Sequence, residues 1–245
     1  MSSPDREELL ITALLELADP AEDQDTAGLT KRLAEYCLLL PGVQAGGVLI
    51  MGERRPMTAT GCGEAAERLE RTQIELDEGP CRDVCHTGLS LADVPLRHPQ
   101  CRARWPRFTA QALAEGFSAA TVLPVRYRAR RLGALSLFHE HRALAGSEVA
   151  LGQALADAVG IGLAYRMDLH GLQDRTGQLQ TALDSRIVIE QAKGVLSERL
   201  GSTPDAAFTL MRGHARAHQL KLTEVAARII DGPADSGPFA RSGLG

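Results

Sequence analysis

Apolar residues recur at helical spacing over several stretches of the first two thirds of the chain and alternate with polar residues between them. Residues 5–18, 27–40 and 105–115 have the spacing of one buried helical face, and residues 65–74 show it more weakly. Strand-like stretches cover 43–51, 56–62, 88–94, 117–125 and 131–140. The first two of these predict a hairpin, and the short third one predicts an edge strand. Helices at both ends of such a sheet predict an α+β domain.

A long helical pattern begins at Ser147 and reaches Leu200. Small residues at 154, 158 and 162 recur every four positions, which favours close approach of a second helix. We therefore interpret 147–180 as a dimer seam and signal relay; the alternative is a helix that packs only on its own sheet. Four glycines interrupt the pattern, and each costs about 1 kcal/mol relative to alanine: Gly160, Gly162, Gly171 and Gly177. They predict a soft point near 171–177, or two helices with a joint, instead of one continuous helix.

Residues 182–231 predict three short helices, the first of which has two apolar strips. The broad strip includes Ala192 and Leu196, and the narrow one consists of Leu183, Ile187 and Gly194. Two strips need two packing partners. A polar row lies beside the narrow strip and suggests a further contact with an anion: Arg186, Glu190, Lys193 and Ser197.

The second of these helices has a strong start signal at Thr203-Pro204-Asp205. A hydroxyl cap, a proline in the first turn and an early acid each favour a helix N-terminus. Arg212 and Arg216 are four residues apart, so their guanidinium groups can point the same way. The third helix takes its core side from Leu222, Val225, Ala226, Ile229 and Ile230.

These C-terminal blocks resemble an ANTAR domain, a small helical module that binds structured RNA in transcription antitermination. The resemblance rests on SRIVIEQAKGVL, AAFTLMRGHAR and LTEVAARII, which occur in the right order and spacing. Upstream, the strings ELDEGPCRDV, RWPRF, EGFSAATVLPV and RLGALSLF resemble a GAF domain. GAF domains are sensory folds with a central antiparallel sheet that hold small ligands, chromophores or metals, or that only dimerise.

Together the two resemblances imply a GAF-like domain over 1–165, with a five- or six-stranded antiparallel sheet flanked by helices. A helical linker or coiled coil over 166–180 would lead to an all-α, three-helix ANTAR-like bundle over 181–232. The tail 233–245 is rich in proline, glycine and serine, which predicts disorder.

The ANTAR resemblance gives seven candidate RNA-binding residues. Arginine combines forked donors with a flat stacking face, a glycine allows close approach, and a glutamine can read a base edge. The alternative is that these are solvated charges on an amphipathic bundle. The RNA target of the family is typically a pair of short hairpin loops, which implies a homodimer. The candidates are Arg186, Gln191, Lys193, Gly194, Arg212, Arg216 and Lys221.

Charge restricts how such binding can work. The chain has a net charge of −4, whereas residues 174–232 contain eight cations and seven acids. RNA binding must therefore depend on local placement of cations. The sequence has no apolar run long enough to span a bilayer, and its N-terminus lacks the pattern of a secretory signal. These features predict a cytoplasmic protein, and nothing in the sequence calls for a cofactor.

Five cysteines, an odd number, favour reduced and mostly buried thiols. Cys81 and Cys85 are one helical turn apart if their segment is helical, so metal binding and redox sensing stay open as alternatives. Cys81 and Trp105 are the candidates for ligand binding by the sensory domain, whose effector is a small molecule or a protein. We expect a regulator and not an enzyme. Two further alternatives are a thiol-dependent methionine sulfoxide reductase of the GAF type and a DNA-binding regulator.

Overall fold

The computed structural model describes residues 3–19, 25–51, 56–140 and 143–232. The chain divides into two compact units, one up to Leu169 and one from His170. We call them the N-terminal unit and the C-terminal unit.

The N-terminal unit is built on an antiparallel sheet whose five described strands have the order β2-β1-β5-β4-β3. Its strands are β1 (Ala45–Met51), β2 (Pro56–Gly61), β3 (Leu91–Pro95), β4 (Ala119–Tyr127) and β5 (Arg130–His139). Its helices are α1 (Ser3–Ala18), α2 (Thr26–Tyr36), η1 (Cys37–Leu39), α3 (Glu64–Glu75), α4 (Pro80–Thr87), α5 (Pro99–Arg104), α6 (Pro106–Ala114) and the first part of α7 (Gly146–Leu200).

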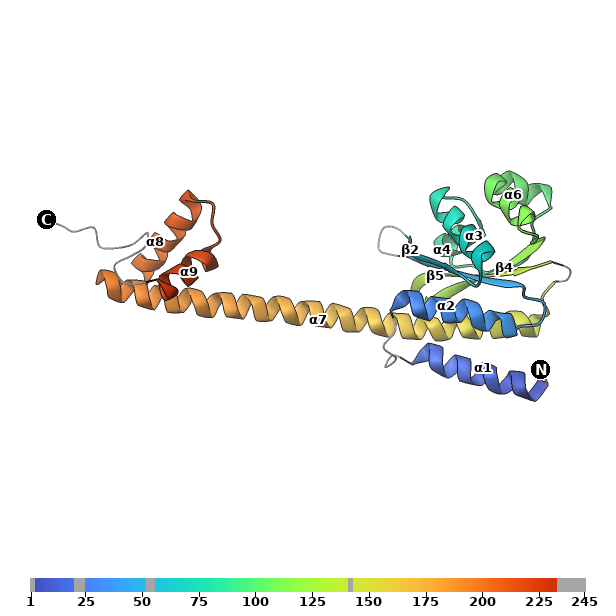
Figure 1. Ribbon diagram of the computed structural model, residues 1–245, viewed down its shortest axis with the longest axis horizontal. Helices are drawn as coiled ribbons and strands as arrows, with labels where there is room; N and C mark the ends of the chain where they lie inside the picture. Colours follow the sequence, from blue (N-terminus) through green and yellow to red (C-terminus); the bar gives the residue numbers. More distant parts are fainter. Residues whose placement is uncertain (1–2, 20–24, 52–55, 141–142, 233–245) are drawn as a thin grey trace. The chain divides into compact units, whose positions relative to one another are not determined.

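Both faces of this sheet are covered, because its central strands bury side chains on both sides. Leu135 and Leu137 of β5 join one core with α1, α2 and α7, whereas Ala134 and Phe138 join another with α3, α4 and α6. Figure 1 shows α2 and α7 along one face of the sheet and α3, α4 and α6 over the other. The predicted α+β class is confirmed, with five strands in the described residues.

Several local predictions are also confirmed. β1 and β2 form the expected hairpin, and β3 is an edge strand paired only with β4 in the described part of the sheet. The segment that contains both Cys81 and Cys85 is helical, as α4. The predicted helix at 105–115 is preceded by a separate short helix, α5, which the sequence pattern did not reveal.

Of the two alternatives for 171–177, two helices with a joint is wrong, because α7 is a single helix of 55 residues. A soft point within one helix stays a prediction. Two of the glycines in α7 serve packing. A Cβ on Gly160 would lie 2.1 Å from the Arg126 carbonyl oxygen, and one on Gly162 would lie 2.7 Å from that of Leu17. Gly171 and Gly177 have no described atom within 4 Å of a built Cβ, and a cost of about 1 kcal/mol each does not break the helix.

The small residues of α7 also pack within their own unit. Ala158 is buried, and Gly162 lies against α1. These two positions therefore offer no surface to a second copy. The interpretation of 147–180 as a dimer seam stays a prediction for the rest of the helix. Beyond them, most side chains described between 171 and 187 are exposed.

The C-terminal unit is a three-helix bundle of the end of α7 with α8 (Pro204–Ala217) and α9 (Leu222–Asp231). Thr203 caps α8 by accepting a hydrogen bond from the Ala206 N–H at 3.3 Å, as predicted. The first helix of this bundle is not a short one, since it is continuous with α7. The core of the bundle contains Ala192, Leu196, Ala207, Met211, Ala215, Val225, Ala226 and Ile229.

The tail 233–245, for which disorder is predicted, lies outside the described residues. Among the helices in the described ranges, none is long and apolar enough to cross a membrane.

Candidate nucleic-acid interface

All seven candidate RNA-binding residues belong to the C-terminal bundle. Four lie on α7, Arg212 and Arg216 lie on α8, and Lys221 immediately precedes α9. The bundle core takes the opposite sides of these helices, so six of the seven side chains or positions are exposed. Lys193 is the exception, with a side chain only 16% exposed.

Lys193 joins α7 to α8. Its ammonium group donates hydrogen bonds to both carboxylate oxygens of Glu190, at 3.1 and 2.9 Å. The same nitrogen lies 5.5 Å from the ring centroid of Phe208, within the range of a cation–π contact. Phe208 is therefore half-buried beneath a charge and does not belong to the fully buried core.

This contact extends the cationic surface from one helix to the next. Arg212 follows Phe208 by one helical turn and Arg216 follows by another, so both continue the side of α8 that meets Lys193. Within the described residues, Arg186, Arg212 and Arg216 have no hydrogen bond or ion pair with a side chain of this chain. Their guanidinium groups are thus available to an anion.

Gly194 lies in open space beside this surface, since no described atom is within 4 Å of the position of a built Cβ. Packing inside the bundle does not require a glycine there, although glycine weakens a helix interior by about 1 kcal/mol. A ligand backbone can approach the helix closely at this point, as the sequence analysis expects.

A pair of histidines at the end of α8 was not predicted from the sequence. The rings of His214 and His218 are 4.3 Å apart. Burial, with smaller contributions from His218 and Arg228, lowers the pKa of His214. His214 is therefore mainly neutral near neutral pH and adds little positive charge to the bundle.

In the N-terminal unit, Cys81 is fully buried in a polar cluster. Its Sγ lies 3.0 Å from the Ser136 Oγ, and its backbone N–H donates to the Gln73 side-chain oxygen at 2.8 Å. Gln73 in turn donates to the carboxylate of Glu70 at 2.9 Å. Burial raises the pKa of Cys81 well above its usual value and that of Cys85 to about 12. Both thiols are therefore poor nucleophiles.

Glu70 is the other unusual member of this cluster. It is fully buried, and desolvation raises its pKa to about 7, against smaller opposite effects of Ser136 and Cys81. Sequence reasoning missed it because residues 65–74 gave only a weak helical pattern. The available signal was that Glu70 and Gln73 share the face of α3 that buries Ala66 and Leu69. In the described ranges, no group of three or more His, Cys, Asp or Glu side chains is arranged to hold a metal.

Trp105, the second ligand-binding candidate, anchors the junction of α5 and α6. It is 4% exposed, and its indole Nε1–H donates to Asp83 of α4 at 3.0 Å. Arg104 also pairs with Asp83, at 2.7 Å, and lies over the indole ring. These contacts attach the helical segment of α5 and α6 to α4.

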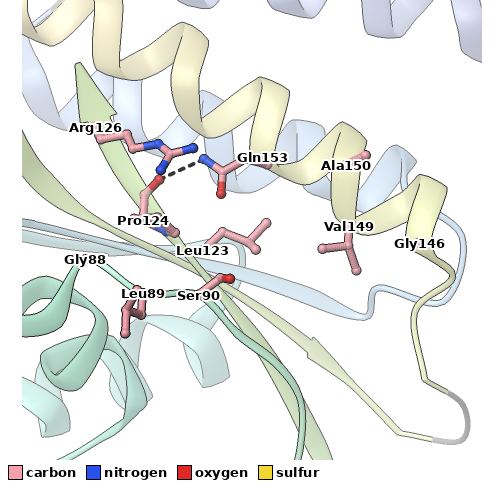
Figure 2. Close-up of a pocket in the computed structure, with 10 residues that line it drawn as sticks. All are labelled: Gly88, Leu89, Ser90, Leu123, Pro124, Arg126, Gly146, Val149, Ala150 and Gln153. Atoms are coloured by element: carbon pink, nitrogen blue, oxygen red, sulfur yellow. Dashed lines mark hydrogen bonds between the residues drawn. The ribbon is translucent and has the colours of Figure 1, made fainter. Parts of the chain in front are cut away.

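A pocket of about 410 Å³ lies elsewhere in the unit, between the first turns of α7, β4 and the segment before β3. Figure 2 shows an apolar part, with Leu123 and Val149, and a polar end formed by Arg126 and Gln153. Gln153 donates to the Pro124 carbonyl at 3.0 Å and to Asp157 at 2.8 Å. Neither Cys81 nor Trp105 lines this pocket. No local sequence pattern indicates this pocket, because its walls come from three separate segments.

Comparison with known proteins agrees with this architecture. The GAF domain family matches residues 23–164, and the ANTAR domain family matches residues 177–230. None of the curated proteins matches the chain.

Among solved structures, the GAF domain from a phosphoenolpyruvate-protein phosphotransferase of Coxiella burnetii is similar. It has 18% identity and a TM-score of 0.51, over 70% of this chain and 99% of that one. The GAF domain from the Acinetobacter phosphoenolpyruvate-protein phosphotransferase has 14% identity and a TM-score of 0.50, over 69% and 97% of the two chains. At these identities the likeness shows the fold alone. The chain belongs to the GAF domain family and carries a C-terminal ANTAR domain, so it joins a sensor domain to an RNA-binding antitermination module.

Proposed function

We propose that this protein regulates transcription antitermination by binding hairpin loops in a leader RNA as a homodimer. The observation that carries the proposal is the row of accessible cations on one side of the bundle, formed by Arg186, Arg212 and Arg216 with Lys193 between the two helices. Phosphate contacts and stacking on guanidinium planes are how proteins recognise splayed loop bases. Gln191, Gly194 and Lys221 extend this surface.

The regulatory step needs no chemistry by the protein. An RNA hairpin that is held by the bundle excludes a competing terminator hairpin that shares its nucleotides. Two hairpin loops would be bound by two bundles, one from each copy in a dimer. The gain in affinity from joining two binding modules then favours an RNA that offers both loops at the right spacing.

We also propose that the pocket beside α7 receives the effector. The apolar part at Leu123 and Val149 and the guanidinium group of Arg126 suit a small molecule with an apolar body and one acceptor group. One wall of the pocket is the first turns of α7, the same helix that carries Arg186 and Lys193. An occupant that contacts α7 and β4 together therefore acts on the helix that leads into the RNA-binding bundle.

The alternatives are less consistent with the geometry. Thiol-dependent reduction needs accessible thiolates, whereas Cys81 and Cys85 are buried with raised pKa values. Duplex DNA reading by α9 is disfavoured by its exposed charges, which are Glu224, Arg228 and Asp231. Two acids and one cation are a poor match for a DNA groove.

The test is the affinity of the full chain for a labelled RNA with two hairpin loops, measured by fluorescence anisotropy. Arg186→Ala combined with Lys193→Ala removes two charges from the proposed surface. We expect the dissociation constant for the RNA to increase at least about 30-fold. The slope of affinity against salt should also fall by about 0.7 for each phosphate that the variant no longer neutralises.

The matched control is Arg97→Ala combined with Arg102→Ala, which removes the same charge from exposed positions of the N-terminal unit. It should leave the affinity within about twofold of wild type, because exposed charges outside the proposed RNA surface are largely screened by salt. Equal losses in the two double variants would show that only net charge matters and would refute the assigned surface.

A further inference from the structure

In the C-terminal unit, the segment of α7 before the bundle has an apolar stripe that the described residues of its own chain leave uncovered. Leu172, Leu179 and Leu183 are 58%, 67% and 55% exposed. With Thr176 they are spaced by four, three and four residues, the alternation of the core positions of a coiled coil. Burial of an apolar stripe is the main source of helix stability in proteins, so a partner that covers these leucines would stabilise this part of α7.

A second copy of this chain is the partner that fits the stripe. In a parallel, in-register pair each leucine meets the same leucine of the other copy. The flanking positions raise no conflict, since Arg175 of one copy faces Gln180 of the other and Ala182 faces Ile187. Both copies then have their bundles at the same end of the seam, as the proposed binding of two loops requires.

The next core position after Leu183 is Arg186, three residues later. A parallel pair therefore brings the guanidinium groups of the two copies toward each other at the end of the apolar seam. Within the described residues Arg186 has no acceptor, and the nearby carboxylate of Glu190 is taken by Lys193 at 2.9 Å. Two facing cations without an acceptor repel each other, so this layer is complete only when an anion lies between them.

We propose that Arg186 of both copies forms one composite anion site at the end of the dimer seam and that the site takes an RNA phosphate. A phosphate has the geometry to accept paired N–H donors from each guanidinium group. The site does not exist in a single chain. This proposal rests on the proposed RNA binding and adds a regulatory link. RNA binding stabilises the dimer seam, and formation of the seam creates the binding site.

The experiment measures dimer dissociation of the full chain by sedimentation equilibrium, with inorganic phosphate replacing chloride at constant ionic strength. The dissociation constant of the wild-type dimer should fall as the phosphate concentration rises, because the anion binds only to the dimer. Arg186→Leu replaces the facing cations with an apolar layer. Its dimer should be about tenfold tighter without phosphate and should not respond to phosphate.

The control is Gln178→Leu, which adds a leucine at an exposed position of α7 that lies outside the stripe. It should keep the wild-type response to phosphate. Leu179→Cys tests the register, because an in-register parallel pair forms an interchain disulfide at this position under mild oxidation.

The inference is overturned if wild-type dimerisation is independent of phosphate, if Arg186→Leu responds to phosphate like wild type, or if Leu179→Cys gives no cross-linked dimer. RNA affinity measured separately on the wild-type chain keeps the outcomes distinct. A chain that binds the two-loop RNA but gives any of these results would retain the proposed function and lose the composite site.

Discussion

In the first part of α7, Leu155, Val159 and Leu163 are buried beneath the sheet, whereas in its second part Leu172, Leu179 and Leu183 are more than half exposed. One continuous helix thus has two kinds of apolar surface. The first is covered by the chain's own fold, which fixes the helix on the sheet. The second is not covered by the described residues of a single chain and lies immediately before the cationic bundle. This difference is the basis of our proposal that α7 belongs to the sensor fold at one end and to a dimer at the other.

The same substitution placed in the two parts of α7 should have opposite effects on stability. Gly160→Ala would put a methyl group 2.1 Å from the Arg126 carbonyl, and moving β4 away should cost about 3 kcal/mol of unfolding free energy. Gly177→Ala meets no described atom within 4 Å and should stabilise the helix by up to about 1 kcal/mol. Urea unfolding followed by Trp105 fluorescence reports on the N-terminal unit, and circular dichroism reports on the helix.

Only Gly160→Ala should move the Trp105 transition to lower urea. Equal effects of the two substitutions would mean that the first part of α7 is no more closely packed than the second, which would contradict the comparison.

The next largest effect concerns polar groups, which the N-terminal unit buries and the bundle exposes. The pKa of Glu70 rises from 4.5 to about 7 on folding, so the native state binds a proton that the unfolded state has released. The contribution of Glu70 to the stability of this unit should therefore be fully present below pH 4.5. It should be lost as the pH rises through 7. Glu70→Gln should stabilise the unit by up to about 3 kcal/mol at pH 8 and by little at pH 5.

Urea unfolding at the two pH values measures this difference. Glu67→Gln, on the exposed side of the same helix, is the control and should show no such dependence on pH. A Glu70→Gln variant that is less stable than wild type at pH 8 would mean that the carboxylate is well solvated or paired.

The smallest effect concerns the pocket beside the buried part of α7. Ala150→Trp fills it from an exposed position on the helix and should change the unfolding free energy by less than about 1 kcal/mol. A small molecule that binds the pocket should raise the melting temperature of wild type in a thermal-shift screen and leave Ala150→Trp unchanged. A molecule that shifts both proteins equally binds elsewhere.

Much of the architecture could be predicted because it depends on local patterns. Thr203 caps α8 as expected, and the strand pattern along residues 131–140 matches β5, which buries side chains on both of its faces. The packing role of Gly160 could not be predicted, because it depends on a carbonyl of Arg126 that is distant in sequence. Helix propensity alone treats that glycine as an interruption of the helix, whereas it allows close packing of α7 on β4.

The candidate sites divide in the same way. The cations of the bundle were accessible to sequence reasoning because their spacing within one helix decides where they point. The contact of Lys193 with Phe208 and the cluster of Glu70 with Gln73 and Cys81 depend on packing between helices. The pocket beside α7 combines segments from Gly88 to Gln153 that are separated in sequence, and no local pattern predicts that they meet.

A competition experiment tests directly whether the exposed part of α7 and its bundle bind folded RNA. The full chain bound to a labelled two-loop RNA is challenged at moderate salt with the unlabelled RNA, with an unstructured RNA of the same composition and with duplex DNA. We expect the unlabelled two-loop RNA to displace the label at concentrations at least about 30-fold lower than either competitor. Equal displacement by all three would contradict it.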